Sequence, residues 1–461
     1  LCFYDLKNQE EKELGTIDAF VISADQKKML VRQERSYAII DLPSAAIKIE
    51  EKLDLNGLEV VLDRRAEWKQ IFEECWRQMK DFFYDPNLHG VDWESIKRKY
   101  QPLAEAVNHR ADLTYVIGEM IGELNAGHTY VGGGDVPQVK RVSVGMLGAQ
   151  LVRDASGYYQ IKKILKGQNW DKNLRSPLTE VGLNVKEGDF ILAVNGRSVK
   201  EMNNIYEALV NTAGKQVRLK INSRPEEKGA REITVIPIEN ENALYYYNWV
   251  ESKREIVDKA TGGQVAYVHI PDMGGRGLNE FVKQFYPQLR KKALIVDVRG
   301  NGGGNVSPMI IERLAREVHM VDIARGGVPT PDPGALLWGP KICLIDEFSA
   351  SDGDIFPYRF RKMNLGRLVG KRTWGGVIGI RGTLPLLDGG FLNKPEFATY
   401  GLEGQWIIEG HGVEPDIYVD NDPAREFEGI DDQLNKAIEL ILEELKTKEK
   451  KLPPVPPYPK K

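Results

Sequence analysis

Three short and almost wholly apolar segments in the second half of the chain most constrain its fold. They lie at 264–270, 293–298 and 341–345. Apolar runs of this length are typical of strands that are buried on both faces, as in parallel sheets. A helix is predicted at 308–318, and strand and helix patterns alternate throughout 241–447. This alternation predicts an α/β domain with a largely parallel sheet.

The remainder of the 461-residue chain predicts four further parts, so the expected fold class is multidomain α+β. Residues 1–60 read as short strands separated by turns, which suits the end of a truncated β-propeller. Residues 61–138 carry apolar residues at three- and four-residue steps and predict amphipathic helices. Residues 139–240 return to strands. Residues 448–461 are rich in proline and lysine and predict a disordered tail or linker.

The part at 139–240 is similar to a PDZ domain. The run Gly-Asp-Phe-Ile-Leu-Ala-Val-Asn-Gly at 188–196 carries this resemblance, and a helix is expected at 203–211. A PDZ domain binds an extended peptide as an added strand at a sheet edge. The loop that would hold the carboxylate of such a peptide is Gly-Met-Leu-Gly at 145–148. The sequence leaves open whether this domain binds peptide or only packs against its neighbours.

Composition excludes several classes of function. Hydrophobic residues make up 42% and charged residues 28% of the chain, and the net charge is −4. This balance gives no reason to expect nucleic acid or a membrane as partner, and no apolar run approaches the ~18 residues of a membrane span. The three cysteines show no CxxC spacing, so neither a disulfide framework nor a metal site is expected. No cofactor is expected either.

The chain begins with leucine, which indicates a fragment or a processed form of a longer protein. No signal-peptide pattern follows the first residue. We therefore expect a cytoplasmic protein. A periplasmic location is the alternative if a targeting segment has been lost.

A candidate nucleophile follows the predicted strand at 341–345. Ser349, Ala350 and Ser351 form a turn of small residues, and a helix can begin near Gly353. Strand, sharp turn, serine and helix expose a hydroxyl, and the amides at a helix N-terminus favour a developing anion. Turn serines are more often caps than nucleophiles, so this signal is weak by itself.

Two further elements strengthen the hypothesis. A glycine-rich turn at 300–304 follows the predicted strand at 293–298, and its amides can face a ligand. No Gly-Lys-Ser/Thr follows, so an oxyanion hole is favoured over a phosphate loop. A serine nucleophile also needs a base. Among the six histidines, His128 lies between small residues in Ala-Gly-His-Thr, whereas His269 and His319 are more simply structural.

Together with Glu-Gly-His-Gly-Val-Glu-Pro-Asp at 409–416, these motifs and the upstream PDZ resemble the S41 family of serine peptidases. The order of the parts resembles the tricorn protease subfamily. The resemblance implies a crotonase/ClpP-like catalytic domain and hydrolysis of short peptides through an acyl-enzyme on Ser351. It also implies His128 as base, Glu409 as the group that orients it, and a homo-oligomer, namely a hexamer.

The resemblance assigns further roles to single residues. The amides of Gly304 and Asp352 would hold the oxyanion, and Gly303 and Asp322 would contact the substrate. An aspartate at a position comparable to Asp322 favours a basic P1 residue in the subfamily, so the same preference is expected here.

Two positions test the type of mechanism. C-terminal processing peptidases of the family use a Ser/Lys dyad, but Gly376 stands where their lysine is expected, which disfavours that mechanism. The tricorn subfamily carries a second serine directly before the histidine, and here that position is Gly127. Thr129 could supply a hydroxyl instead. This departure keeps an alternative open: a catalytically impaired scaffold that binds peptides through its PDZ domain.

Overall fold

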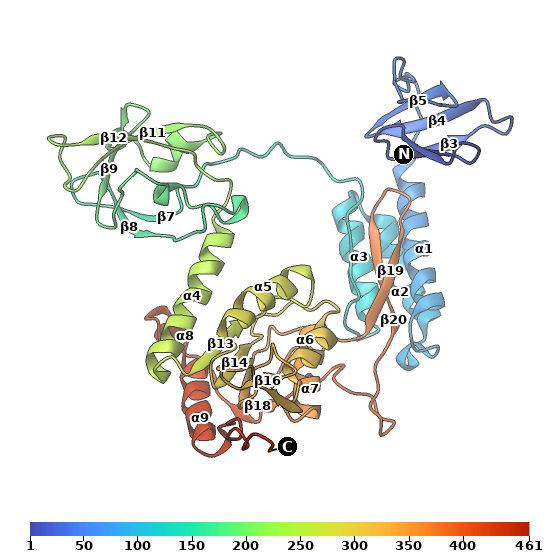
Figure 1. The fold of residues 1–461 in the computed structure, drawn as a ribbon. Coiled ribbons are helices and arrows are strands. Elements are labelled where there is room, and N and C mark those ends of the chain that lie inside the picture. Colours follow the sequence, from blue (N-terminus) through green and yellow to red (C-terminus); the bar gives the residue numbers. More distant parts are fainter. Residues whose placement is uncertain (461) are drawn as a thin grey trace. The chain divides into compact units, whose positions relative to one another are not determined.

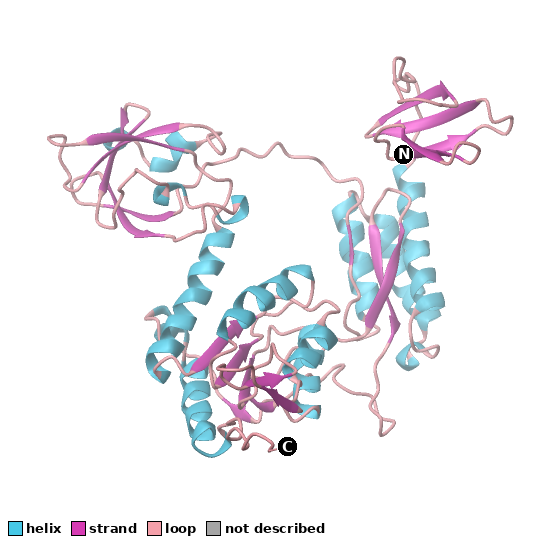
Figure 2. Cartoon of the chain, in the orientation of Figure 1, coloured by secondary structure: helices cyan, strands magenta, loops and turns pink. Residues whose placement is uncertain are grey.

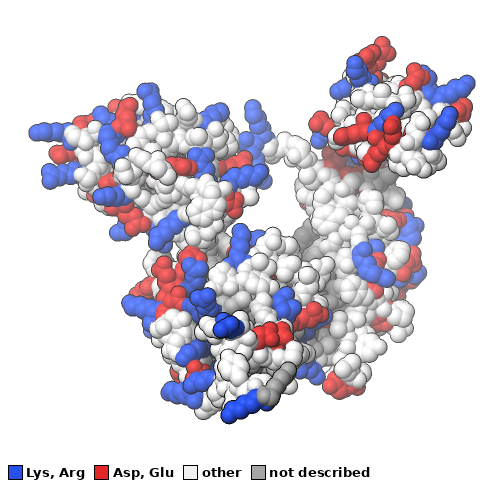
Figure 3. Space-filling view, viewed as in Figure 1, with Lys and Arg blue, Asp and Glu red and all other residues white. Residues whose placement is uncertain are grey.

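The computed structural model describes residues 1–460, and the chain divides into two compact units between Glu67 and Trp68 (Figure 1). The first unit is built of strands, whereas the second contains both helices and strands (Figure 2). No helix of residues 1–460 is long and apolar enough to cross a membrane. On the face shown in Figure 3, basic and acidic side chains are interspersed.

The first unit contains strands only, apart from the start of the first helix. Two antiparallel sheets are present, a pair β1-β2 and a three-stranded sheet β3-β4-β5. The strand bounds are Cys2–Asp5, Glu10–Glu13, Ala19–Ile22, Lys28–Gln33 and Ser36–Asp41. Met29, Val31 and Ala38 form their small core. The expected short strands are therefore confirmed, whereas the assignment to a propeller stays a prediction.

Three helices open the second unit. They are α1 (Arg64–Phe82), α2 (Trp93–Ala106) and α3 (Arg110–Gly122), with a short 3-10 turn η1 (Leu88–Gly90) between the first two. Apolar residues at three- and four-residue steps, such as Ile71, Cys75 and Met79 on α1, face a shared core. The amphipathic helices predicted in this part are therefore confirmed, and α2 contains Pro102.

A hairpin from the C-terminal half of the chain covers these helices (Figure 1). It consists of β19 (Gly379–Pro385) and β20 (Phe391–Phe397), and β20 pairs with β6 (Val131–Gly132). Its buried Leu386 and Leu392 belong to the same core as the helices. Segments about 260 residues apart in the sequence therefore fold as one body.

The PDZ-like part forms one sheet with the strand order β12-β11-β9-β8-β7, and β10 pairs with β9. In chain order, strands β7 to β12 span Ala149–Arg153, Tyr159–Ile164, Phe190–Val194, Arg197–Ser198, Val217–Asn222 and Arg231–Val235. The short 3-10 turns η2 to η5 span Lys172–Leu174, Pro177–Thr179, Val199–Glu201 and Ile205–Leu209. The helix expected at 203–211 is only the 3-10 turn η5, which begins after the cap residue Asn204 and ends before Val210, where the backbone is extended.

A five-stranded parallel sheet forms the centre of the C-terminal part, in the order β13-β14-β17-β18-β21. Its strands span Val265–His269, Ala293–Asp297, Lys341–Ile345, Gly366–Gly370 and Ile417–Tyr418. The expected parallel sheet is confirmed, and the predicted strand at 341–345 has the observed bounds.

Helices cover both faces of this sheet, because successive strand residues point to opposite sides. On one face, α5 (Gly275–Phe285), α6 (Ser307–Leu314) and α7 (Asp352–Lys362) share a core with Val268 and Val296. On the other, α4 (Asn242–Thr261) and α9 (Asp432–Lys448) pack against Tyr267 and Ile295. The remaining elements are η6 (Tyr286–Gln288), the pair β15 (Met320–Asp322) and β16 (Thr330–Asp332), and α8 (Pro423–Phe427). Residues 449–460 of the expected tail form no helix or strand, and Lys461 lies outside the described residues.

A buried ion pair joins the helices to the hairpin. Arg110 donates from Nε to Asp388 at 2.5 Å, and the two side chains are only 1% and 2% exposed. Amides of Gly390 and Asp135 also donate to the Asp388 carboxylate. Burial opposes ionisation of Asp388, but the bonds from Arg110 and these amides lower its pKa. The pair therefore stays charged in a site that water does not reach.

We predict that Arg110→Ala destabilises the second unit by about 3–5 kcal/mol, because it leaves a buried carboxylate without its cation. Thermal or urea unfolding measures the loss. Arg98→Ala is the control, since Arg98 is 70% exposed and its ion pair is long at 3.9 Å. The control should change stability by less than about 0.5 kcal/mol. Equal effects of the two variants would contradict this account of the hairpin's anchor.

Candidate active site

Ser351 lies between the end of β17 and the first residue of α7, as the sequence predicted. Its backbone has φ 59° and ψ −121°, a conformation that non-glycine residues rarely adopt. Its side chain does not cap α7. The turn that precedes it is fixed by Ser349, whose hydroxyl donates to Val298 O at 2.8 Å, and by the Ala350 amide, which donates to Asn301 O. Strain of this kind is concentrated at functional sites, since only a firmly held surrounding sustains it.

The glycine turn after β14 passes directly beside Ser351. A Cβ on Gly303 would lie 2.5 Å from the Ser351 Cβ and 2.7 Å from Ala350 O. A Cβ on Gly304 would lie 2.0 Å from Met273 O. Both residues also have positive φ. Only glycine fits at these two positions. The glycines of this turn are therefore required by the close approach of two backbone segments.

Two backbone amides next to Ser351 are unused within the described residues, those of Gly304 and Asp352. The Gly303 amide instead donates to Asn301 Oδ1 at 2.9 Å. The Asp352 carboxylate is turned away from Ser351, because it accepts bonds from the amide and the hydroxyl of Ser307. Its amide is thus free at the first position of α7, where a negative charge is favoured.

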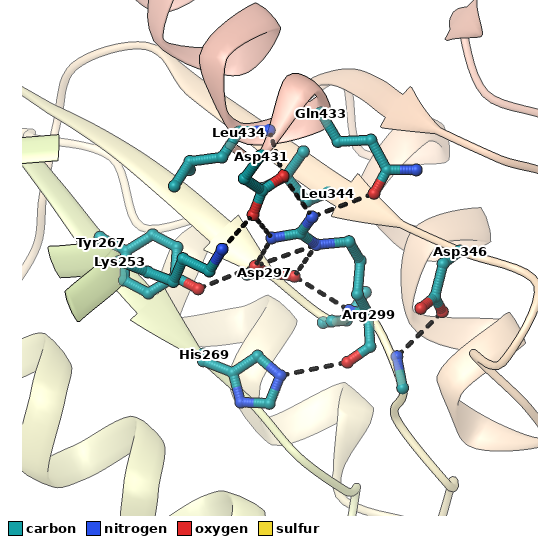
Figure 4. A network of polar contacts seen from close by, with 12 residues as sticks. Lys253, Tyr267, His269, Asp297, Arg299, Leu344, Asp346, Asp431, Gln433 and Leu434 are labelled. Carbon is teal, nitrogen blue, oxygen red and sulfur yellow. Dashed lines mark hydrogen bonds and ion pairs between the residues drawn. The ribbon is translucent and has the colours of Figure 1, made fainter. Parts of the chain in front are cut away.

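A buried network of charges lies under the start of the glycine turn (Figure 4). Arg299 binds the carboxylates of Asp297 and Asp431, and Lys253 binds Asp431 at 2.7 Å. Tyr267 donates its hydroxyl to Asp297 at 2.8 Å. Burial would raise the pKa of Asp431, but Arg299 and Lys253 hold it well below its usual range. Two anions and two cations therefore balance each other at the base of the turn.

His128 follows α3 in a tight bend with φ 61° and is half-buried. Its ring is edge-on to the rings of Trp374 and Tyr130, with centroids 6.3 and 6.1 Å away. Trp374 in turn donates its amide to Ser349 O, which connects the His128 side of the site to the turn that carries Ser351. No hydrogen bond joins the side chains of His128 and Ser351 in the described chain.

Burial lowers the pKa of His128, and the charge of Glu409 opposes this shift. The Nδ1 atom is buried and has no hydrogen-bond partner among the described residues. The imidazole is therefore held mainly neutral near pH 7, which is the form that accepts a proton.

Glu409 lies beside His128 but does not bond to it. Its carboxylate accepts the amides of Gly127 at 2.7 Å, Val377 at 2.6 Å and Ile378 at 3.0 Å. The structure thus brings Glu409 to the backbone of the residue before His128. This bonding fixes the carboxylate with three amides and keeps it close enough for its charge to act on the imidazole.

The two glycines that depart from the family patterns lie against each other. A Cβ on Gly127 would lie 2.9 Å from Gly376 Cα and 3.2 Å from Glu409 Oε1. A serine at 127 would therefore require the neighbouring backbone to shift. The Thr129 hydroxyl donates to Ala126 O at 3.2 Å and so is engaged with its own turn.

Asp322 is the predicted site residue that the structure does not bring into contact with the others. It ends β15 and is exposed, and its carboxylate makes no hydrogen bond or ion pair within the described residues.

Sequence reasoning missed Asp354, one turn into α7. Its carboxylate accepts the Gly375 amide at 2.8 Å, and burial raises its pKa to about 6. It holds the loop that leads to Gly376 and to the amides that bind Glu409. The only available signal was its position three residues after Ser351, which does not reveal a partner 21 residues away.

No group of three or more His, Cys, Asp or Glu side chains within residues 1–460 is arranged to hold a metal ion.

Comparisons with known proteins find similar sequences and one similar structure. Family models match in three places: the tricorn protease C1 domain at 64–122, the tricorn protease PDZ domain at 145–240 and peptidase family S41 at 264–419. The chain is 36% identical over 98% of its length to tricorn protease homolog 1 of Streptomyces coelicolor.

The chain contains a domain of peptidase family S41, and its three matched parts are similar to those of tricorn proteases. Its 264–419 part is a serine peptidase domain. The whole chain is also 36% identical, over 96% of its length, to a putative tricorn-like protease C-terminal subunit of Sulfurisphaera tokodaii. It covers 52% of that protein. A crystal structure of the tricorn protease matches 97% of the chain with a TM-score of 0.89 and 31% identity. The chain covers 43% of both that protein and the Streptomyces relative.

We predict that Gly303→Ala lowers kcat/KM for peptide hydrolysis by at least about 100-fold, because its methyl group would displace Ser351 and the Asp352 amide. Gly302→Ala is the matched control, since a Cβ there meets nothing within 4 Å. The control should retain activity within about threefold. Comparable activity of the two variants would show that the close approach at Gly303 does not matter for the site.

Proposed function

We propose that the protein is a serine oligopeptidase that hydrolyses short peptides through an acyl-enzyme on Ser351. One observation carries this proposal: the strained Ser351 lies against the glycine turn, and the neighbouring amides of Gly304 and Asp352 have no hydrogen-bond partner among the described residues. A carbonyl oxygen that becomes negative during attack by Ser351 would find both donors already in place.

The proposed reaction begins with attack of Ser351 Oγ on the peptide carbonyl carbon. His128 accepts the hydroxyl proton, and we assign this to Nε2 because Nδ1 is buried. The C–N bond then breaks, and His128 returns the proton to the leaving amine. A water molecule attacks the acyl-enzyme by the same steps, which releases the acid and restores Ser351. Gly303 lines the path of the substrate beside the nucleophile.

Glu409 acts in this scheme as a positioning residue. Its bond to the Gly127 amide fixes the backbone beside His128, and its charge stabilises the imidazolium that forms during attack. A hydroxyl relay between the two is not needed for this role. Gly127 can therefore replace the serine of the subfamily pattern without removing the influence of Glu409.

A second candidate is a peptide-binding scaffold without activity. The unpartnered Nδ1 of His128 favours it, because an imidazole whose Nδ1 bonds to no carboxylate is a poorer base. The scaffold differs from the peptidase in one testable respect: Ser351 would be dispensable for every function of the chain.

The same proposal includes a division of the chain into five parts, with a propeller end at 1–60. It also includes a crotonase/ClpP-like fold for 241–447. A homo-oligomeric assembly, in particular a hexamer, and a cytoplasmic location complete it. Light scattering on the purified protein tests the assembly.

Cleavage of a peptide library by the wild type and by Ser351→Ala tests the proposed activity. We expect the wild type to cleave short peptides and the variant to be slower by at least about 1,000-fold. Equal cleavage by both proteins would mean that the nucleophile lies elsewhere. Absence of cleavage by the folded wild type would favour the scaffold.

The pH dependence of kcat/KM tests the role of His128. Because the neutral imidazole is the active form and burial lowers its pKa, activity should rise with pH with a midpoint below the ordinary 6.5. Glu409→Gln removes the charge that opposes this shift, so the midpoint should move to still lower pH. Glu414→Gln, at a side chain that is 71% exposed, should leave the profile unchanged. A midpoint that rises in Glu409→Gln would contradict the assignment.

Asp322 is proposed to favour a basic residue at P1. We expect peptides with Arg at P1 to be cleaved faster than those with Leu or Phe, and Asp322→Asn to reduce this preference about tenfold. Glu317→Gln, at a nearby exposed carboxylate, is the control. Equal rates for the three peptides, or a preference for Phe, would exclude the role.

A further inference from the structure

The carboxylate loop of the PDZ domain already holds a carboxylate. The amides of Gly148 and Ala149 both donate to Glu241 Oε1, at 2.7 and 3.1 Å. Glu241 follows the last strand of the PDZ domain and directly precedes α4. It occupies the N-cap position of α4, yet its side chain does not cap that helix. The carboxylate is instead directed at the loop that in a PDZ domain receives a peptide C-terminus.

An apolar side chain accompanies this carboxylate. Leu244, in the first turn of α4, is only 1% exposed. A Cβ on Gly148 would lie 3.3 Å from its Cδ1, and a Cβ on Gly167 would lie 3.0 Å from its Cδ2. Glu241 and Leu244 together thus present a carboxylate and a buried apolar group, which are the two features of a peptide C-terminus that such a loop recognises.

A third residue extends the contact by one turn. Asn248 accepts the Lys166 amide at 3.0 Å and donates to Lys166 O at 2.8 Å. Glu241, Leu244 and Asn248 are spaced three and four residues apart, so they lie on one face of the helix. The PDZ domain therefore binds one continuous helical face of its own chain.

The same helix reaches the catalytic part at its other end. Trp249 packs edge-on against His269 with centroids 4.8 Å apart, and Lys253 binds Asp431 in the buried charge network. The occupied loop and the network under the glycine turn are thus connected through α4. Burial raises the pKa of Glu241, while the two amides oppose the shift.

We propose that Glu241 and Leu244 are the resident ligand of the PDZ carboxylate loop, so that the domain clamps the start of α4 and accepts a free peptide C-terminus only when that turn is displaced. The edge of β7 remains without a partner strand among the described residues, since β7 pairs only with β8. A displaced turn would therefore expose both the carboxylate loop and a strand edge for a peptide.

Hydrogen exchange tests whether the loop is occupied. We expect the amides of Gly148 and Ala149 to exchange at least about tenfold faster in Glu241→Ala than in the wild type, because they lose their acceptor. Glu241→Gln keeps an acceptor oxygen and should show a smaller increase. Glu239→Ala is the control, since Glu239 is exposed and makes no contact with the loop. Equal exchange in wild type and Glu241→Ala would overturn the proposal, and protected amides in β13 serve as the check that each variant is folded.

Peptide binding tests whether the site is latent. The probe is a fluorescent octapeptide that ends in leucine, with either a free or an amidated C-terminus, and all proteins carry Ser351→Ala to prevent cleavage. We expect no preference for the free acid in the otherwise unchanged chain. In Glu241→Ala and in Glu241→Ala combined with Leu244→Ala, we expect the free acid to bind at least about tenfold more tightly than the amide. A preference for the free acid while Glu241 is intact would overturn the proposal, as would its absence from both variants.

Discussion

The contact between Arg299 and the two carboxylates of Asp297 and Asp431 is the interaction on which the site depends. Arg299 directly precedes the glycine turn, and its own carbonyl accepts a bond from His269 at 3.1 Å. Burial alone would lower the pKa of Arg299, but the two aspartates raise it well above its usual value. Removing any member would leave an uncompensated buried charge, which is far more costly than the loss of a surface ion pair. The network therefore fixes where the glycine turn begins.

From that fixed point, the site is assembled almost entirely by backbone groups. The glycine turn approaches Ser351 so closely that a Cβ on Gly303 could not be accommodated, and Glu409 is held by three amides from two distant segments. Backbone donors lose little conformational freedom when a substrate arrives, so they suit a role that requires preorganisation. This explains why glycine, rather than a charged side chain, marks the most constrained positions.

Much of this arrangement could be predicted from local patterns. Apolar runs gave the central strands, and the strand, turn and helix pattern gave the place of Ser351. Three features could not be predicted in this way, because they depend on contacts between distant segments. They are the ion pair of Arg110 with Asp388, the bonds of Glu409 to backbone amides rather than to His128, and the bonds of Glu241 to the PDZ loop. In the last case the sequence contained no sign of the contact, since a glutamate at a helix N-terminus has an ordinary local explanation in the helix dipole.

The most direct test of the central claim is the intact mass of the protein after reaction with a fluorophosphonate, followed by mapping of the modified residue. The account predicts a single adduct per chain, located on Ser351 and absent from folded Ser351→Ala. An adduct on another residue, or no adduct on the folded wild type, would contradict it.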